Sequence, residues 1–385
     1  MAQLVDPPNF ERTRGSVVER FIHIEDVRGS NPLGSTMKIL FLSRLFYPHI
    51  GGVEKHVLEI SKILVQKGHK TTVITEELSI EDIPVYLQSR RKIPRRENID
   101  HIEVYRIPVG GNNWFKKFRI WFWLWEHKDL IVKADIVHCH DVFFWYLPFR
   151  FLFPKKLIYT TFHGYESYPL KFKSILMHKI AEKLSKGNIC IGNFMKKWYG
   201  AKPDYVAYGG VNISKSEKRK VKSENSAVFI GRLDEQTGIK TYVDAVKLII
   251  KKNPNFKLEI IGDGKFRKEI EKDFTVLGFQ ENPEKYFSKY HFAFVSRYLS
   301  ILEALAAKRL VFAVYDNPLK EDYLRMAPFS KYITISSSVS DLVSKISFSL
   351  DNEKDKAKMI KGGYVWVEKR TWEQMANVCL RLWRV

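Results

Sequence analysis

The chain has 385 residues, of which 45% are hydrophobic, and its formal net charge is +21 at pH 7. This length suits two ordinary domains, and no apolar run reaches the roughly 18 uncharged residues that a membrane-spanning helix needs. Three widely spaced cysteines exclude a disulfide framework and a cysteine metal cluster, and they fit a reducing, cytoplasmic setting. The excess of positive charge favours a polyanionic partner, and the alternative is that the extra lysines and arginines serve only solubility.

Residues 1–36 lack the period-2 and period-3.6 patterns of the remaining chain, and nothing in them resembles a signal peptide. Met37–Leu42 resembles a protein start that runs into a first strand. Gly29–Pro32 can be encoded by the arm near the 3′ end of a transfer-RNA gene, and Ser35–Met37 can be encoded across its terminal CCA. We therefore expect a non-native leader, with a genuine disordered tail as the alternative. An N-terminal peptide beginning at the first residue of the native protein would refute the leader hypothesis.

The next residues predict one βαβ unit. Lys38–Ser43 has the composition of a buried strand, a helix begins at Val53, and Thr71–Thr75 predicts the second strand. Gly51 and Gly52 precede the helix, where small residues let a ligand approach the backbone at the helix N-terminus. The segment lacks the G-x-G-x-x-G fingerprint, which argues against a dinucleotide dehydrogenase.

Residues 76–100 are charged and irregular, which predicts a mobile excursion before a strand at Ile102–Ile107. Trp114–Trp125 then combines aromatic with basic side chains. A helix here would carry an aromatic stripe that suits a membrane interface, whereas packing of the stripe against the sheet is the alternative. The stripe consists of Trp114, Phe118, Trp121 and Trp125.

Polar residues follow the next two predicted strands. In Asp135–Asp141, His138 and His140 alternate as metal ligands could, but no third ligand is evident, so structural or ligand-contacting roles are favoured. Leu157–Thr161 leads to His163, and a histidine at the carboxyl end of a strand is well placed for catalysis.

A helix at about Phe172–Ser185 and a last short strand at Asn188–Gly192 complete the first half of the chain. Tyr205–Val211 leads into the basic, polar run Lys215–Lys222, which predicts a hinge surface.

In residues 221–311, short apolar runs alternate with Lys-rich segments of helical spacing. This alternation predicts a parallel sheet with helices on its faces, and ligands bind such sheets at the carboxyl ends of the strands. Arg232, Gly262–Gly264 and Ser296 lie at those ends, so we place a ligand there.

These motifs occur in the same order as in the GT-B-fold glycosyltransferases of family 4, the group 1 glycosyltransferases, and the chain resembles this family. The resemblance runs from Met37 to the C-terminus and rests on Pro48–Val57, Asp135–Asp141, Phe162–Gly164, Gly210–Asn212, Gly231–Leu233, Ile261–Gly264, Leu302–Ala304 and Lys369–Glu373. It implies an α/β fold of two Rossmann-like, doubly wound parallel-sheet domains that face a cleft. The implied domains are an acceptor-side domain at 37–205, a nucleotide-sugar-binding domain at 206–365 and a helix at 366–385 that returns to the first domain.

The resemblance also implies a function: retaining transfer of a sugar from a UDP- or GDP-sugar donor to a glycan or lipid-phosphate acceptor, in cell-surface polysaccharide or glycolipid synthesis. Neither a metal nor another cofactor is implied, and the expected setting is cytoplasmic, with peripheral attachment at the inner face of the plasma membrane. His163 is the implied catalytic residue, Arg232 would bind the diphosphate and Glu303 the ribose. The donor-binding residues implied are Gly51, Gly52, Arg232, Thr237, Lys240, Leu299, Ser300 and Glu303.

The chain departs from the family pattern at two places. Thr237 stands where the family has a lysine before glycine, with Lys240 as the nearby substitute. The Glu-Gly-Phe-Gly that precedes L-E-A in the family is absent, so Tyr298 runs directly into Leu299. Because the tetrad supplies the carboxylate that binds the donor sugar, a non-catalytic nucleotide-sugar- or glycan-binding protein on the same fold is the alternative. Nucleic-acid binding ranks last, since no nucleic-acid motif is present.

Overall fold

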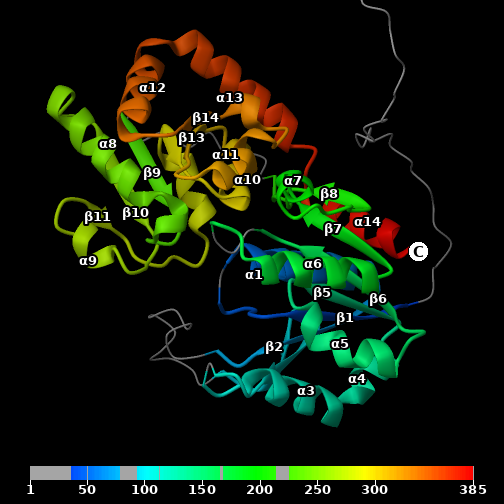
Figure 1. Cartoon of the computed structure of the whole chain (residues 1–385). Coiled ribbons are helices and arrows are strands. Elements are labelled where there is room, and N and C mark those ends of the chain that lie inside the picture. Colours follow the sequence, from blue (N-terminus) through cyan, green and yellow to red (C-terminus); the bar gives the residue numbers. More distant parts are fainter. Residues whose placement is uncertain are drawn as a thin grey trace, which may run out of the picture. The chain divides into compact units, whose positions relative to one another are not determined.

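The computed structural model describes residues 36–49, 51–78, 93–111, 113–164, 168–213 and 225–384. They form two sheets with helices on their faces (Figure 1), which confirms the predicted α/β fold class. The predicted hinge at Lys215–Lys222 and nearly all of the predicted leader lie outside the described residues.

The first sheet has eight strands in the order β3-β4-β2-β1-β5-β6-β7-β8, and all neighbours are parallel except β3 and β4. Its strands are β1 Lys38–Ser43, β2 Lys70–Glu76, β3 Arg96–Ile99, β4 Ile102–Ile107, β5 Ile136–His140, β6 Leu157–Phe162, β7 Gly187–Ile191 and β8 Tyr205–Ala207. Its helices are α1 Gly52–Gln66, α3 Lys116–Glu126, α4 Lys128–Lys133, α5 Phe143–Leu152, α6 Phe172–Leu184 and α7 Phe194–Trp198. Figure 1 shows α3, α4 and α5 together on one side of this sheet.

Two expectations for the first half were wrong. Part of the segment expected to be irregular forms the edge strand β3, because its charged side chains contact residues of the neighbouring strand β4. Glu97 pairs with the buried guanidinium of Arg106 at 2.7 Å, and Arg96 lies over the Tyr105 ring. The strand expected to be the last, β7, is followed by β8, which pairs with it in parallel. Residues 79–92 of the expected excursion lie outside the described part of the chain.

Helix α3 forms, but its aromatic stripe does not make up its buried face. Ile120 and Leu124 are the side chains that α3 buries, whereas Trp114 lies before the helix and is 65% exposed. Only Trp121 of the predicted stripe turns inward, and its Nε1–H donates to the carbonyl of Phe144 at 3.1 Å. The alternative of a stripe packed against the sheet is therefore wrong for the stripe as a whole.

The second sheet has six parallel strands in the order β11-β10-β9-β12-β13-β14. Its strands are β9 Ser226–Ile230, β10 Lys257–Ile261, β11 Thr275–Val276, β12 Phe292–Phe294, β13 Leu310–Val314 and β14 Thr334–Ser336. Its helices and 3-10 turns are η2 Glu235–Thr237, α8 Ile239–Lys252, α9 Arg267–Ile270, η3 Pro283–Lys289, α10 Tyr298–Ala306, α11 Pro318–Arg325, η4 Ser330–Tyr332, α12 Val339–Asp351 and α13 Glu353–Val367.

Side chains of β9 alternate between two hydrophobic cores. Ala227 and Phe229 pack with residues of α8 and α12, whereas Val228 and Ile230 join a core that includes α10 and α13. Successive side chains of a strand point to opposite faces, so this alternation buries both faces of the sheet.

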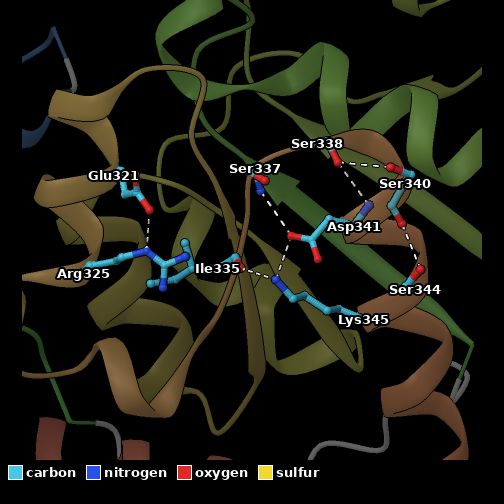
Figure 2. A network of polar contacts seen from close by, with 9 residues as sticks. All are labelled: Glu321, Arg325, Ile335, Ser337, Ser338, Ser340, Asp341, Ser344 and Lys345. Carbon is cyan, nitrogen blue, oxygen red and sulfur yellow. Dashed lines mark hydrogen bonds and ion pairs between the residues drawn. The ribbon is translucent and has the colours of Figure 1, made fainter.

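A polar network fixes the start of α12 (Figure 2). Ser338 Oγ accepts a hydrogen bond from the backbone N–H of Asp341 at 3.2 Å, as an N-cap residue does. The Asp341 carboxylate in turn accepts from the N–H of Ser337 and from Lys345, whose ammonium also donates to the carbonyl of Ile335. These contacts tie β14 to the helix that follows it.

The last helix, α14 Trp372–Trp383, packs against α1 of the first sheet, with Glu373 near Lys67 at 3.4 Å. Its N-cap is Thr371, whose hydroxyl accepts from the N–H of Gln374. This is the predicted return of the C-terminal helix. None of the described helices has the length and apolar character needed to cross a bilayer.

Candidate functional site

Two neighbouring residues of α1 contact the two groups on which the predicted chemistry depends. The Lys55 ammonium donates to Glu303 Oε1 of α10 at 2.7 Å and to Glu284 Oε2 of η3 at 3.2 Å. The His56 ring meets the His163 ring edge to face, with centroids 4.6 Å apart. The expected ribose-binding glutamate and the expected catalytic histidine therefore both lie against the first turns of one helix.

His163 follows β6 and is held from two sides by β5 and the residue after it. Its Nε2 lies 2.8 Å from Nδ1 of His140, and its backbone N–H donates to Asp141 Oδ1 at 2.9 Å. Asp141 has φ 60°, in the left-handed region that L-residues other than asparagine and aspartate seldom adopt. Such a conformation at the carboxyl end of a strand is typical of functional sites.

His138 has a different role from His140, although the sequence pattern pairs them. The indole N–H of Trp383 donates to His138 Nδ1 at 3.1 Å, and His138 Nε2 lies 2.8 Å from the Thr161 hydroxyl. Because an indole can only donate, the proton of a neutral His138 is on Nε2 and is donated to Thr161. His138 thus joins α14 to the first sheet.

The imidazoles of His56, His140 and His163 form a cluster in which each ring offers one nitrogen, and these three nitrogens lie within 4.8 Å of one another. Among the described residues this is the one set that offers three nitrogen ligands to a metal ion, and sequence reasoning found only His140 as a member of a pair. One nitrogen each of His140 and His163 is already used in their mutual hydrogen bond.

Burial keeps these imidazoles neutral. It lowers the pKa of His56 to about 3, and it holds the pKa values of His140 and His163 well below their usual range. The site therefore offers uncharged nitrogens for hydrogen bonding at physiological pH.

The pair formed by Lys55 and Glu303 is mostly buried, and burial opposes both charges. For Lys55, burial lowers the pKa, but Glu303 and Glu284 offset this and the pKa is raised. For Glu303, burial is the largest influence and the pKa is raised, although Lys55 acts to lower it. The 2.7 Å contact between the Lys55 ammonium and the Glu303 carboxylate is a charge-assisted hydrogen bond, so the two groups form an ion pair.

Arg232 follows β9 and has a second arginine beside it. The guanidinium groups of Arg232 and Arg297 each donate to the side-chain oxygen of Gln236, both at 3.0 Å. The Arg232 side chain is 63% exposed and also pairs with Asp234 at 3.3 Å. Two guanidinium groups at one glutamine form a basic patch of the kind that binds phosphate in a bidentate manner.

The structure does not bring Thr237 and Lys240 into this patch. Thr237 is buried, and its hydroxyl donates to the carbonyls of Arg232 at 2.7 Å and Asp234 at 2.9 Å, so it shapes the loop. The ammonium of Lys240 pairs with Glu269 at 3.0 Å, above the ring of Phe266.

The remaining predicted donor-binding residues lie at helix N-termini. Gly51 is the N-cap of α1 and Gly52 its first residue, and the Glu54 carboxylate lies where a Cβ on Gly51 would project. Leu299 and Ser300 are in the first turn of α10. Backbone N–H groups in first turns can bind an anion.

A tyrosine is packed tightly at the point where the tetrad is absent. The ring of Tyr298 stacks on Tyr323 with centroids 3.8 Å apart, and a Cβ on Gly192 would overlap the Tyr298 ring. The backbone N–H of Tyr298 donates to the Tyr323 hydroxyl at 2.8 Å. This N–H is therefore already satisfied within the protein.

Sequence reasoning missed Lys55, His56 and Arg297 as site residues. Lys55 and His56 follow the predicted glycines after Val53 and Glu54, and Arg297 is separated from the missing tetrad by Tyr298. A charged residue beside a site motif is a weak signal on its own, and their partners are far away in the sequence, 248 residues in the case of Lys55 and Glu303.

Comparisons with known proteins show the family and the fold of the chain. Residues 50–215 match the family described as Glycosyltransferase Family 4, and residues 211–366 match Glycosyl transferases group 1. An uncharacterized glycosyltransferase of Methanocaldococcus jannaschii is 27% identical over 242 residues, which are 61% of this chain and 62% of that protein. The chain thus matches less than two thirds of this relative's length.

Solved structures share the fold. The structure of Anabaena HepE in complex with UDP and glucose superposes with a TM-score of 0.65 at 15% identity, covering 90% of this chain and 98% of HepE. The structure of TarM superposes with a TM-score of 0.68 at 14% identity, covering 92% of this chain and all 100% of TarM. With two family matches that adjoin and span most of its length, this chain belongs to the group 1 glycosyltransferases, the family 4 proteins of GT-B fold.

Proposed function

We propose that the protein is a retaining glycosyltransferase that moves a sugar from a nucleotide-sugar donor to a glycan or lipid-linked acceptor without a metal ion. The observation that carries the proposal is the double contact of α1: Lys55 bonds to Glu303, and its neighbour His56 packs against His163. The residue proposed to hold the donor ribose and the residue proposed to face the reacting sugar are thus both positioned by one helix.

Metal independence is proposed from the cations that the protein itself supplies. The leaving diphosphate would meet the guanidinium groups of Arg232 and Arg297 and the first-turn N–H groups at Leu299 and Ser300. Preorganised donors of this kind stabilise a developing negative charge without a Lewis acid. Transfer unaffected by EDTA is the expected result.

UDP-sugars are the first donors to test. Two structural neighbours were solved in complex with UDP and a sugar: glucose for HepE and GlcNAc for the pneumococcal O-GlcNAc transferase GtfA. Both are remote in sequence, so they guide only the choice of ligand.

We further propose that the protein meets an anionic membrane at the cytoplasmic face, in the synthesis of cell-surface polysaccharide or glycolipid. Phe122 of α3 is 64% exposed, Phe151 of α5 is 70% exposed and Phe172 of α6 is 78% exposed. Helix α5 packs against both α3 and α6, so these apolar side chains lie on neighbouring helices. Aromatic side chains among lysines on a protein with a net charge of +21 suit an interface of anionic lipids.

The first experiment is a thermal-shift screen of the protein against UDP-, GDP-, ADP- and TDP-sugars. We expect one nucleotide to stabilise the wild type and to have no effect on Arg232→Ala or Glu303→Ala. Lys240→Ala is the matched control, because it removes a cation that lies against Glu269, outside the basic patch. If a well-folded protein shows no shift with any nucleotide, the donor site is contradicted, and the non-catalytic glycan-binding alternative gains support.

A further inference from the structure

The hydrogen bond between His140 and His163 raises the question of which ring carries the proton. The two nitrogens, His140 Nδ1 and His163 Nε2, are 2.8 Å apart, and both rings are neutral because of their burial. A neutral imidazole has one N–H and one bare nitrogen, so only two arrangements are possible. In one, His140 donates from Nδ1; in the other, His163 donates from Nε2.

The far side of the His140 ring separates these arrangements. His140 Nε2 is buried and has no hydrogen-bond partner in the described part of the chain. If His163 were the donor, the proton of His140 would be on this Nε2 as a buried N–H without an acceptor. If His140 is the donor, Nε2 carries only an unpaired lone pair. Orphaned buried N–H groups are rarer in proteins than under-satisfied acceptors, which favours His140 as the donor.

The carboxylate of Asp141 favours the same arrangement from the side of His163. Asp141 Oδ1 accepts from the backbone N–H of His163 at 2.9 Å. By covalent structure, Nδ1 is the ring nitrogen nearer to the backbone of its own residue, and the carboxylate is hydrogen-bonded to that backbone. A nearby negative charge stabilises the positive end of an N–H dipole, which favours a proton on Nδ1 of His163.

We propose that His140 is a positioning residue that holds His163 as its Nδ1–H tautomer, so that His163 donates a hydrogen bond to a sugar hydroxyl rather than acting as a base. The role toward the sugar depends on the proposed function, whereas the tautomer does not. A donor at this position suits chemistry in which the sugar must be oriented while charge develops between the ring and the leaving diphosphate.

The test is nitrogen NMR of the full chain labelled with 15N-histidine, at neutral pH. The His163 resonances are assigned by their disappearance from the spectrum of the His163→Gln variant. We expect the His163 Nδ1 resonance at a protonated position and its Nε2 at an unprotonated one. The reverse assignment in the wild type overturns the proposal, and this measurement requires neither a variant of His140 nor any activity.

Variants then test the role of His140. His140→Asn keeps an N–H donor close to the position of Nδ1, whereas His140→Leu removes it. We expect the leucine variant to lose the single tautomer of His163 and to have a transfer rate about tenfold to hundredfold lower at unchanged donor KM, with much of the loss restored in the asparagine variant. His178→Gln is the control, since His178 is a buried imidazole of the same half of the chain that lies outside the cluster.

The outcomes distinguish the two proposals. An Nδ1–H tautomer in a protein that transfers no sugar from any donor counts against the proposed function and supports the hydrogen-bond assignment. A His140→Leu variant that folds, keeps the His163 tautomer and keeps the wild-type rate overturns the positioning role. If His140→Leu does not fold, the wild-type spectrum together with the rate of His140→Asn decides the matter, and a slow asparagine variant would contradict the proposal.

Discussion

Lys55 and Glu303 are 248 residues apart in the chain, and their side chains meet at 2.7 Å. The contact joins α1, which packs on the first sheet, to α10 of the second sheet. It also occupies the carboxylate proposed to bind the donor ribose, so a donor that uses Glu303 must share it with Lys55.

Replacing Lys55 with methionine should lower the free energy of unfolding by about 3 kcal/mol at pH 7. The reason is that a mostly buried Glu303 carboxylate is left without its partner, and breaking a buried pair from one side is costly. Urea denaturation at pH 7 measures the difference. The double variant Lys55→Met with Glu303→Gln is the control and should recover most of the loss, because no buried charge is left alone.

The loss in Lys55→Met should be smaller at pH 5 than at pH 7. Burial raises the pKa of Glu303 in the folded protein, and removing Lys55 raises it further. Below this raised folded-state pKa the folded protein binds a proton that the unfolded chain does not, so stability increases as the pH falls. A loss that is equal at both pH values would contradict the assignment of a buried lone carboxylate.

Arg297 should matter for donor binding, and Lys240 should not. Arg297 shares the Gln236 oxygen with Arg232, whereas Lys240 pairs with Glu269. Loss of one charged hydrogen bond is worth about 1.5–3 kcal/mol, so Arg297→Ala should weaken nucleotide binding roughly tenfold to hundredfold. Isothermal titration calorimetry with the nucleotide found in the screen measures the dissociation constants of the Arg297→Ala and Lys240→Ala variants. Weakening by Lys240→Ala and not by Arg297→Ala would restore the assignment made from the sequence.

The exposed aromatic side chains should control membrane attachment without affecting stability. We expect a variant with Trp114, Phe122 and Trp125 changed to alanine to lose sedimentation with anionic vesicles and to keep the wild-type melting temperature, because these side chains are about half exposed or more. Phe348→Ala is the control, an exposed aromatic on α12 of the second sheet. Trp121→Ala should instead lower the melting temperature, since Trp121 donates to Phe144. Equal vesicle binding by the triple variant and the wild type would contradict the membrane proposal.

Ser338→Ala should destabilise the protein by about 1 kcal/mol, the usual value of an N-cap hydroxyl. Ser344→Ala is a matched change on the same helix, because Ser344 only donates to the carbonyl of Ser340 one turn earlier (Figure 2). We expect it to be neutral within about 0.5 kcal/mol. Chemical denaturation of both variants compares them, and equal effects would exclude a specific role for the cap.

The strands were predictable because their signals are local. Short apolar runs that end at glycine or a polar residue predicted most of the parallel strands, and backbone geometry explains why glycine is needed at such ends. Gly262 has φ 143°, and a Cβ there would overlap the carbonyl oxygen of Gly231. The edge strand β3 gave no such signal, because its stability depends on Arg106, a buried cation of the neighbouring strand.

The pairing of site residues was less predictable because it depends on contacts between distant segments. The motif residues Arg232 and His163 could be placed at strand ends from the sequence. Nothing local to Lys55 shows that it reaches Glu303, and nothing in residues 297–300 shows that Arg297 reaches Gln236. The buried face of α3 was equally hard to predict, because the helix carries apolar residues on more than one face. Ile120 and Leu124 are the side chains that it buries.

The stacked pair of Tyr298 and Tyr323 has a consequence for protein engineering. Grafting Glu-Gly-Phe-Gly back before Leu299 would displace a ring that fills the space above Gly192 and would take the Tyr298 N–H away from the Tyr323 hydroxyl. The shortened loop and its two tyrosines thus form one unit that must be exchanged together. Restoring the tetrad therefore requires new packing between Tyr298 of α10 and Tyr323 of α11.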